Sequence, residues 1–120
     1  WPTDVCVPIS QLADAIEVAL QELEESNLYA PLVGHVGDGN FHLCYILNPD
    51  DPEEFTRAEE HYKRMIERAL AVGGTCTGEH GIGAGKRHFL EQEHPAGIAV
   101  MQAIKQAIDP TATLNPGKVV

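Results

Sequence analysis

The sequence predicts an α+β domain: a ferredoxin-like βαββαβ sandwich with extra C-terminal helices and an extended tail. Three observations support this class. Two long segments carry apolar residues every three or four positions, as amphipathic helices do, and short β-branched segments lie beside them. Glycine and proline mark the junctions. With 120 residues and 43% hydrophobic content, the chain can build one modest core, so we expect one domain over residues 1–120.

The first expected strand is Asp4–Ile9. It belongs near a sheet edge because Pro8 cannot donate a hydrogen bond to a central ladder. Ser10 is the expected N-cap of a helix over Gln11–Glu25, which the polar residues 26–27 end. The apolar residues of this helix form one stripe, so that stripe packs on the core while the acidic residues face water.

A hairpin follows, with expected strands at Leu32–Val36 and Phe41–Leu47. Its turn is expected at Asp38-Gly39, a dipeptide that type I′ turns prefer because both central residues need positive φ. Alternate residues of the second strand face opposite sides of the sheet. Either both faces are covered, or one face is open to a ligand.

Two histidines flank this turn in the segment GHVGDGNFH, residues 34–42. The expected register places Val36 opposite Phe41 and His35 opposite His42, with the Cβ atoms of the two histidines roughly 4.5–5.5 Å apart. Two ring nitrogens at this spacing can converge on one metal ion. The alternative is that each histidine is only a polar residue at a strand end.

The second long helix has a strong start signal. Asp51 is its expected N-cap, Pro52 its first residue, and Glu54 is placed to close a capping-box-like pair. The glycines at 73–74 end the helix, as expected of a left-handed cap. Thr75–Thr77 is expected to form the last strand of the sandwich.

Two further helices are expected near Lys86–Gln92 and Pro95–Ile108, before the tail LNPGK. Three other histidines lie on predicted polar helix faces or helix ends. We therefore expect solvated side chains at His61, His88 and His94.

A second functional candidate is the glycine-rich run of residues 78–83, Gly-Glu-His-Gly-Ile-Gly. Adjacent extended side chains point in opposite directions, so Glu79 can turn toward the histidine pair while His80 faces a neighbouring ligand. This gives a metal set of two histidines and one carboxylate with open positions. The alternative is a hinge whose glycines fit tight turns and whose Glu79 is solvated. The position of this loop is expected to depend on parts of the protein outside the chain.

Net charge, cysteine usage and hydrophobicity argue against several classes of protein. The net charge of −10 leaves no nucleic-acid footprint, so an anionic substrate needs local cations or a metal. The three cysteines form no CxxC pair, which favours reduced thiols in an intracellular compartment. No apolar run approaches the roughly 20 residues of a membrane helix, so we expect a soluble domain.

Three motifs in this order, GHVGDGNFH, TGEHGIG and LNPGK, resemble the C-terminal cap domain of FAD-linked oxidases of the vanillyl-alcohol oxidase type. The segments TDVCVPIS and GTCTGEHGIGAGKR are most similar to the D-lactate dehydrogenase and glycolate oxidase flavin-subunit group. The resemblance covers nearly the whole chain. It implies a flavoenzyme whose N-terminal FAD-binding domain is absent from this chain.

The resemblance also implies residue roles. The divalent-metal ligands of the family match His35, His42 and Glu79. His80 matches the active-site histidine beside substrate and flavin, and Asn115 matches a tail segment that returns toward the flavin. Relatives acting on 2-hydroxyglutarate carry an asparagine where this chain has Cys44, which favours a smaller or less polar acid.

The implied function is oxidation of D-lactate, or of glycolate, to the 2-oxo acid by hydride transfer to FAD, with help from zinc, manganese or iron. The implied partners are the FAD-binding domain in cis and a downstream electron acceptor. The compartment would be the cytoplasm in a bacterium and the mitochondrion in a eukaryote. The alternative is a free-standing ferredoxin-like module that binds a metal or metabolite without catalysis. The sequence upstream of Trp1 would discriminate between them.

Overall fold

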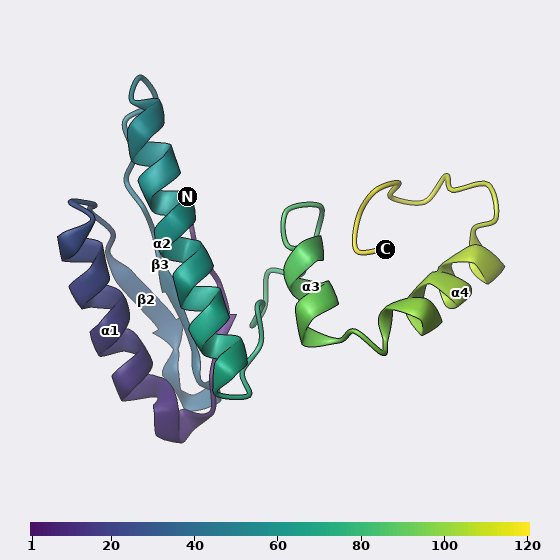
Figure 1. Cartoon of the computed structure of the whole chain (residues 1–120), viewed down its shortest axis with the longest axis horizontal. Helices are drawn as coiled ribbons and strands as arrows, with labels where there is room; N and C mark the ends of the chain where they lie inside the picture. Colours follow the sequence, from purple (N-terminus) through teal and green to yellow (C-terminus); the bar gives the residue numbers. More distant parts are fainter. The chain divides into compact units, whose positions relative to one another are not determined.

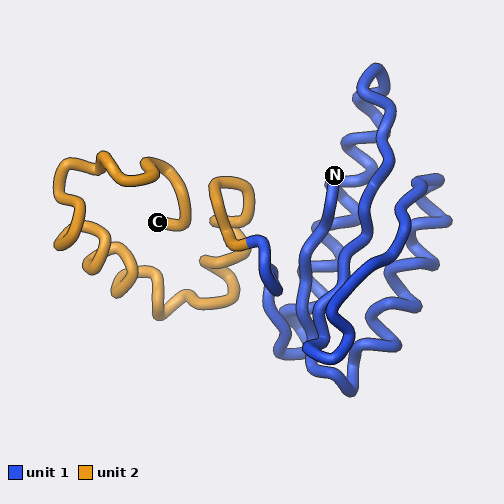
Figure 2. Tube along the Cα trace, turned by 180° about the vertical axis from the view of Figure 1, so that it is seen from behind, with its two compact units in different colours: residues 1–80 blue, residues 81–120 orange.

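The computed structural model describes residues 1–120 and confirms the predicted α+β class. The chain divides into two compact units, residues 1–80 and residues 81–120 (Figure 2). The first unit contains the sheet and the two long helices. The second contains two shorter helices and the tail.

The sheet of the first unit has three antiparallel strands in the order β1-β3-β2, which are Val5–Cys6, Asn40–Leu43 and Leu32–His35. The strand expected at Thr75–Thr77 is reduced to one bridge, between Thr75 and Cys6. The fourth-strand prediction was therefore wrong in extent. The reason is that the chain after Thr75 turns its amides toward the buried side chain of Asp4 instead of continuing the ladder.

Two helices cover one face of this sheet, α1 at Leu12–Glu25 and α2 at Pro52–Ala71 (Figure 1). The predicted N-cap of α2 is confirmed, because the Asp51 side chain accepts hydrogen bonds from two backbone amides of the first turn. The expected pairing of Glu54 with the N-cap was wrong, because the Glu54 carboxylate accepts the Asn48 amide instead. The predicted cap of α1 was wrong. Ser10 lies inside a 3-10 turn, η1 at Ile9–Gln11, and α1 begins after it without a side-chain cap.

Alternate residues of the β3 segment point into the core between sheet and helices. Phe41, Leu43 and Tyr45 are buried there, as the strand periodicity predicts. His61 of α2 is also 0% exposed, so its predicted solvation was wrong. Burial is tolerated because both ring nitrogens are paired: the Tyr45 hydroxyl lies 2.5 Å from Nδ1, and the Ala19 carbonyl lies 2.9 Å from Nε2.

The hairpin register differs from the predicted one by two residues. His35 pairs with Asn40, and Val33 pairs with His42. The loop contains a 3-10 turn, η2 at Val36–Asp38, followed by Gly39 at φ 77°. A type I′ turn does not form because Asp38 does not adopt positive φ. A shift of two keeps side chains on the same face, so His35 and His42 are diagonal neighbours rather than opposed ones.

The second unit contains α3 at Arg87–Glu93 and α4 at Ile98–Ile108, close to the predicted helices. Asp109 ends α4 and is buried, with its carboxylate accepting hydrogen bonds from Lys105, Thr113 and Leu114. No residue of α4 is buried. None of the helices combines the length and apolar character that a membrane crossing requires.

Candidate metal centre

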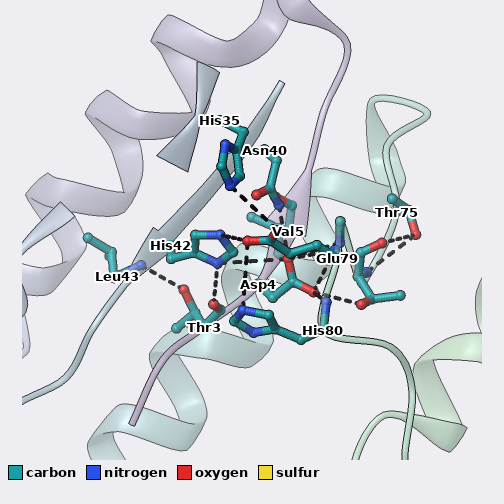
Figure 3. Close-up of polar contacts among 12 residues, drawn as sticks. Thr3, Asp4, Val5, His35, Asn40, His42, Leu43, Thr75, Glu79 and His80 are labelled. Atoms are coloured by element: carbon teal, nitrogen blue, oxygen red, sulfur yellow. Dashed lines mark hydrogen bonds and ion pairs between the residues drawn. The ribbon is translucent and has the colours of Figure 1, made fainter. Parts of the chain in front are cut away.

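Four side chains meet on the sheet face that the helices leave open (Figure 3). His35 comes from β2 and His42 from β3, while Glu79 and His80 come from the loop after α2. The Nε2 atom of His42 lies 2.8 Å from Glu79 Oε1, and the Nε2 atom of His35 lies 3.5 Å from Glu79 Oε2. The structure thus brings together all three residues that the sequence nominates as metal ligands.

His42 is the best-fixed of these side chains, with 5% exposure. Its Nδ1 atom lies 2.7 Å from the carbonyl oxygen of Thr3. A carbonyl can only accept, so Nδ1 must carry a proton, and in the neutral ring Nε2 then presents a lone pair. The Thr3 hydroxyl accepts the amide of Leu43, which leaves the Thr3 carbonyl available to the ring.

The contact between His42 and the Glu79 carboxylate is unfavourable when the imidazole ring is neutral. With its proton on Nδ1, the ring offers no donor at Nε2, and this buried nitrogen has no hydrogen-bond partner although Glu79 Oε1 lies 2.8 Å away. Two facing lone pairs repel, so a second ring proton or a cation must lie between them. Ligands about 2.0–2.2 Å from one ion are themselves roughly 2.9–3.5 Å apart in octahedral or tetrahedral sites. The separation of His42 Nε2 and Glu79 Oε1 is therefore compatible with two ligands of one divalent ion.

His80 adds a second imidazole to the cluster. Its ring stacks on His42, with centroids 4.8 Å apart and an interplanar angle of 13°. Its Nε2 atom lies 3.8 Å from Glu79 Oε1. The ring is about half exposed, so a ligand can reach it.

These groups border a pocket of about 450 Å³ in the first unit. Cys44, two residues beyond His42 on the same strand face, also faces this pocket. The lining residues are Pro2, Val33, Gly34, His35, His42, Cys44, Glu79 and His80.

The sequence reasoning missed Asp4. This carboxylate is 1% exposed and lies beneath the cluster, 3.8 Å from His42 Nδ1. The only sequence signal was an acidic residue beginning an otherwise apolar, β-branched segment. Asp4, His42 and His80 form the group whose ligand atoms all lie within 4.8 Å of one another, close enough to hold a metal. Glu79 fits better than Asp4, because the Asp4 oxygens already accept several hydrogen bonds.

Asn115 belongs to the second unit, where it adopts φ 46° and its carbonyl accepts the amide of Lys118. Its expected place near the flavin stays a prediction.

Comparison with known proteins gives a consistent set of relatives. The family model described as "FAD linked oxidases, C-terminal domain" matches residues 1–119. The chain is 49% identical over 120 residues to the probable mitochondrial D-lactate dehydrogenase of Danio rerio, covering 99% of this chain and 24% of that protein. It is 45% identical over 121 residues to the mitochondrial D-lactate dehydrogenase (cytochrome) of Arabidopsis thaliana, covering 98% and 21%.

A bacterial relative is more distant. The chain is 36% identical over 116 residues to the glycolate oxidase subunit GlcD of Bacillus subtilis, covering 96% of this chain and 25% of that protein. The chain therefore spans about a quarter of the length of these curated relatives.

Proposed function

We infer the function from one premise: the chain belongs to the family of C-terminal domains of FAD linked oxidases. We propose that it is the substrate and metal domain of an FAD-dependent dehydrogenase that oxidises a D-2-hydroxy acid to the 2-oxo acid. D-Lactate is the first candidate substrate and glycolate the second, because the named relatives are D-lactate dehydrogenases and a glycolate oxidase subunit. The comparisons offer no support for the free-standing binding module.

One observation carries the metal part of this proposal. The Nε2 lone pair of His42 faces Glu79 Oε1 at 2.8 Å, while the Nδ1 proton is committed to the Thr3 carbonyl. His35 approaches the other oxygen of the same carboxylate. A second proton on His42 would satisfy only the first contact, whereas a divalent cation bound by His42 and Glu79 would also attract the His35 nitrogen beside the same carboxylate.

The ligand set indicates which ions suit the site. Two imidazole nitrogens and a carboxylate accept zinc, manganese or iron and leave coordination positions open. When bound, the metal supplies positive charge that favours ionisation of the substrate hydroxyl, and FAD accepts the hydride. FAD would be held mainly by the N-terminal domain of the full-length protein, with Asn115 in the tail that approaches it.

His80 is the candidate base. It lines the pocket beside the ligand set, and its half-exposed ring can receive the hydroxyl proton at a ring nitrogen. Loss of that proton leaves the electron pair on oxygen to form the carbonyl, and the hydride leaves from the α-carbon. The His80 ring stacks on the buried His42 ring, and this contact holds the candidate base in place.

The pocket favours a small acid. Cys44 faces it as a compact, weakly polar side chain, and Val33 borders it from β2. These groups offer little to a second substrate carboxylate. Together they support D-lactate or glycolate over a longer diacid.

The remaining parts of the proposal concern the whole protein. Its partners would be the FAD-binding domain in cis and a downstream electron acceptor. The compartment would be mitochondrial in a eukaryote, as in the names of two relatives, and cytoplasmic in a bacterium.

The test is turnover by the full-length protein with D-lactate, L-lactate and glycolate. We expect activity on D-lactate and none on L-lactate, and activity on neither D-lactate nor glycolate would overturn the substrate proposal. His80→Gln should lower kcat by about 10²–10⁴-fold, the usual contribution of a general base. His88→Gln is the matched control, because His88 is an exposed histidine of α3.

A further inference from the structure

Asp4 is a buried carboxylate under the candidate metal centre, and it accepts hydrogen bonds from backbone amides and neutral side chains around it. We propose that Asp4 is a positioning residue: it holds the loop of residues 77–80 so that Glu79 reaches the metal and His80 reaches the substrate. This inference rests on the proposed metal site and adds a residue that neither the motifs nor the family resemblance assigns.

The loop presents a run of donors to this one side chain (Figure 3). Asp4 Oδ1 accepts the Gly78 amide at 3.0 Å, and Oδ2 accepts the His80 amide at 3.0 Å. The amide of Glu79 lies 3.3 Å from both oxygens. Consecutive amides that converge on one anion form a concave backbone site, and its shape fixes the backbone angles of the residues that contribute.

Two side chains complete the anchor. The Thr77 hydroxyl donates to Oδ2 at 2.6 Å, and the Asn40 amide nitrogen donates to Oδ1 at 2.9 Å. Asn40 also donates to the Val5 carbonyl at 2.9 Å, so it ties β3 to β1, the strand that directly follows Asp4. Three segments that are distant in sequence therefore meet at one carboxylate.

The backbone of Asp4 is itself clamped. Its amide donates to the Tyr62 hydroxyl at 3.0 Å, and that hydroxyl donates to the Asp4 carbonyl at 3.2 Å. Tyr62 is a buried residue of α2. Tyr62 thus holds the Asp4 backbone from the core side, and the Asp4 carboxylate in turn holds the loop amides on the open side of the sheet.

The result of this anchoring is seen in the side chains. Glu79 and His80 are consecutive, yet Glu79 contacts His42 Nε2 and His80 stacks on the same ring. Both would lose this convergence if the loop backbone shifted, because neither side chain is buried and held by packing of its own.

Asp4 is a poor candidate for a metal ligand itself. Its two oxygens together accept bonds from five groups, so few lone-pair directions remain. The His42 nitrogen nearest to it, Nδ1 at 3.8 Å, is the protonated one that donates to Thr3. The two interpretations differ in what happens to the coordination of a bound ion when Asp4 is replaced.

A substitution at Gly78 tests the contact between the loop and Asp4 independently of the carboxylate itself. A Cβ at this position would lie 1.9 Å from the Asn40 amide nitrogen and 3.1 Å from Asp4 Oδ1. Gly78→Ala therefore pushes the loop off the anchor while leaving the carboxylate and every proposed ligand unchanged.

The experiment uses the full-length protein and cobalt as the probe ion. The dissociation constant is measured by competition with a chromophoric chelator on folded wild type, Asp4→Asn and Gly78→Ala. We expect both variants to bind cobalt about 10–100-fold more weakly, the usual effect of partners behind the ligands. At saturating cobalt the visible absorption spectrum should match that of wild type, because the ligand atoms are the same.

Asp109→Asn is the matched control. Asp109 is likewise a buried carboxylate that holds a turn through several hydrogen bonds, and we expect its replacement to leave the cobalt affinity unchanged. A merely structural role for Asp4 would lower thermal stability without changing the affinity of the folded protein.

The possible results distinguish failure of the Asp4 positioning role from failure of the proposed metal site. Wild-type affinity in both Asp4→Asn and Gly78→Ala overturns the positioning role, and a changed spectrum in Asp4→Asn overturns it in favour of direct ligation. If Asp4→Asn does not fold, Gly78→Ala decides. If wild type binds no cobalt, or binds it equally well after His42→Ala, the proposed metal site itself is wrong.

Discussion

The ring of His42 is held by a hydrogen bond that the side chain of Thr3 makes possible. In an ordinary antiparallel ladder the Thr3 carbonyl would accept the Leu43 amide, but here the Thr3 hydroxyl accepts it at 2.8 Å. The carbonyl is then free to accept the proton on His42 Nδ1 at 2.7 Å. One hydroxyl thus determines which nitrogen of a buried histidine faces the pocket.

Replacing this hydroxyl gives the first prediction at the residue scale. In Thr3→Val, the Leu43 amide and the His42 ring compete for one carbonyl, so a buried N–H loses its acceptor. We expect the free energy of unfolding to fall by about 1–3 kcal/mol and the affinity for zinc to fall as well. Urea unfolding and zinc titration of the variant measure the two effects.

The control for Thr3→Val is Thr56→Val on the exposed side of α2. Its hydroxyl only donates to the Pro52 carbonyl one turn earlier. If both threonine variants retain the zinc affinity of wild type, the hydroxyl of Thr3 does not set the orientation of His42.

At the scale of elements, α1 and α2 are joined by polar contacts, partly or fully buried, as well as by apolar packing. The Glu22 carboxylate of α1 accepts hydrogen bonds from Arg64 and Arg68 of α2. Burial raises the pKa of Glu22, but the hydrogen bonds from Arg68 and Arg64 lower it more, so the pKa lies below its ordinary value. His61 adds a second link, from α2 to the Ala19 carbonyl of α1.

This second link predicts a pH dependence of stability. Burial lowers the pKa of His61 below its ordinary 6.5, so the folded protein resists protonation of a ring that the unfolded chain protonates readily. The stability that His61 contributes is therefore complete above about pH 6.5 and declines as the pH falls below that value. Burial also raises the pKa of Tyr45, whose hydroxyl keeps its proton and donates it to the ring.

The measurement compares urea unfolding of the 120-residue chain and of His61→Gln between about pH 5 and pH 8. We expect the variant to be less stable at pH 8 and the difference between the two proteins to shrink as the pH falls. A difference that stays constant over this range would contradict the prediction. His88→Gln, which replaces an exposed histidine, should show no such trend.

The helices were predictable from the sequence because the signals that set them are local. Apolar spacing and the Asp51 cap specify α2 within its own segment, and the structure confirms both. The hairpin register was not predictable in the same way. Asp38-Gly39 favours a two-residue turn by composition, whereas the observed loop also contacts the segment after the first strand, where the Val7 amide donates to the Gly39 carbonyl.

The same division holds within the candidate site. The ligand set of His35, His42 and Glu79 could be nominated from motifs, because turn glycines and ligating side chains stand in short segments. Asp4 could not, because its donors lie 36 to 76 residues away in the sequence. Only the fold brings a carboxylate that precedes the first strand under a loop that follows the second long helix.

At the scale of the whole molecule, the candidate centre is built within residues 1–80. The sequence suggested that the loop carrying Glu79 depends on parts of the protein outside this chain. The structure places its anchors, Asp4 and Asn40, within the same unit as the loop. The flavin-binding part of the proposed enzyme, in contrast, would lie in sequence outside this chain, which spans 24% of one relative's length.

These facts give opposite expectations for the isolated 120-residue chain. It should show no flavin absorbance and no dehydrogenase activity, yet it should bind added zinc, more weakly than the full-length protein does.

Because the loop is anchored within the chain, Glu79→Ala should weaken zinc binding about as much as His42→Ala does. Glu67→Ala, which replaces an exposed glutamate of α2 paired only with Lys63, is the control and should bind zinc as wild type does. Calorimetric titration with zinc compares the four proteins. Normal binding by Glu79→Ala together with loss in His42→Ala would mean that the loop needs the rest of the protein to reach the histidines, and stoichiometric FAD in the purified chain would contradict the assignment of flavin binding to the missing part.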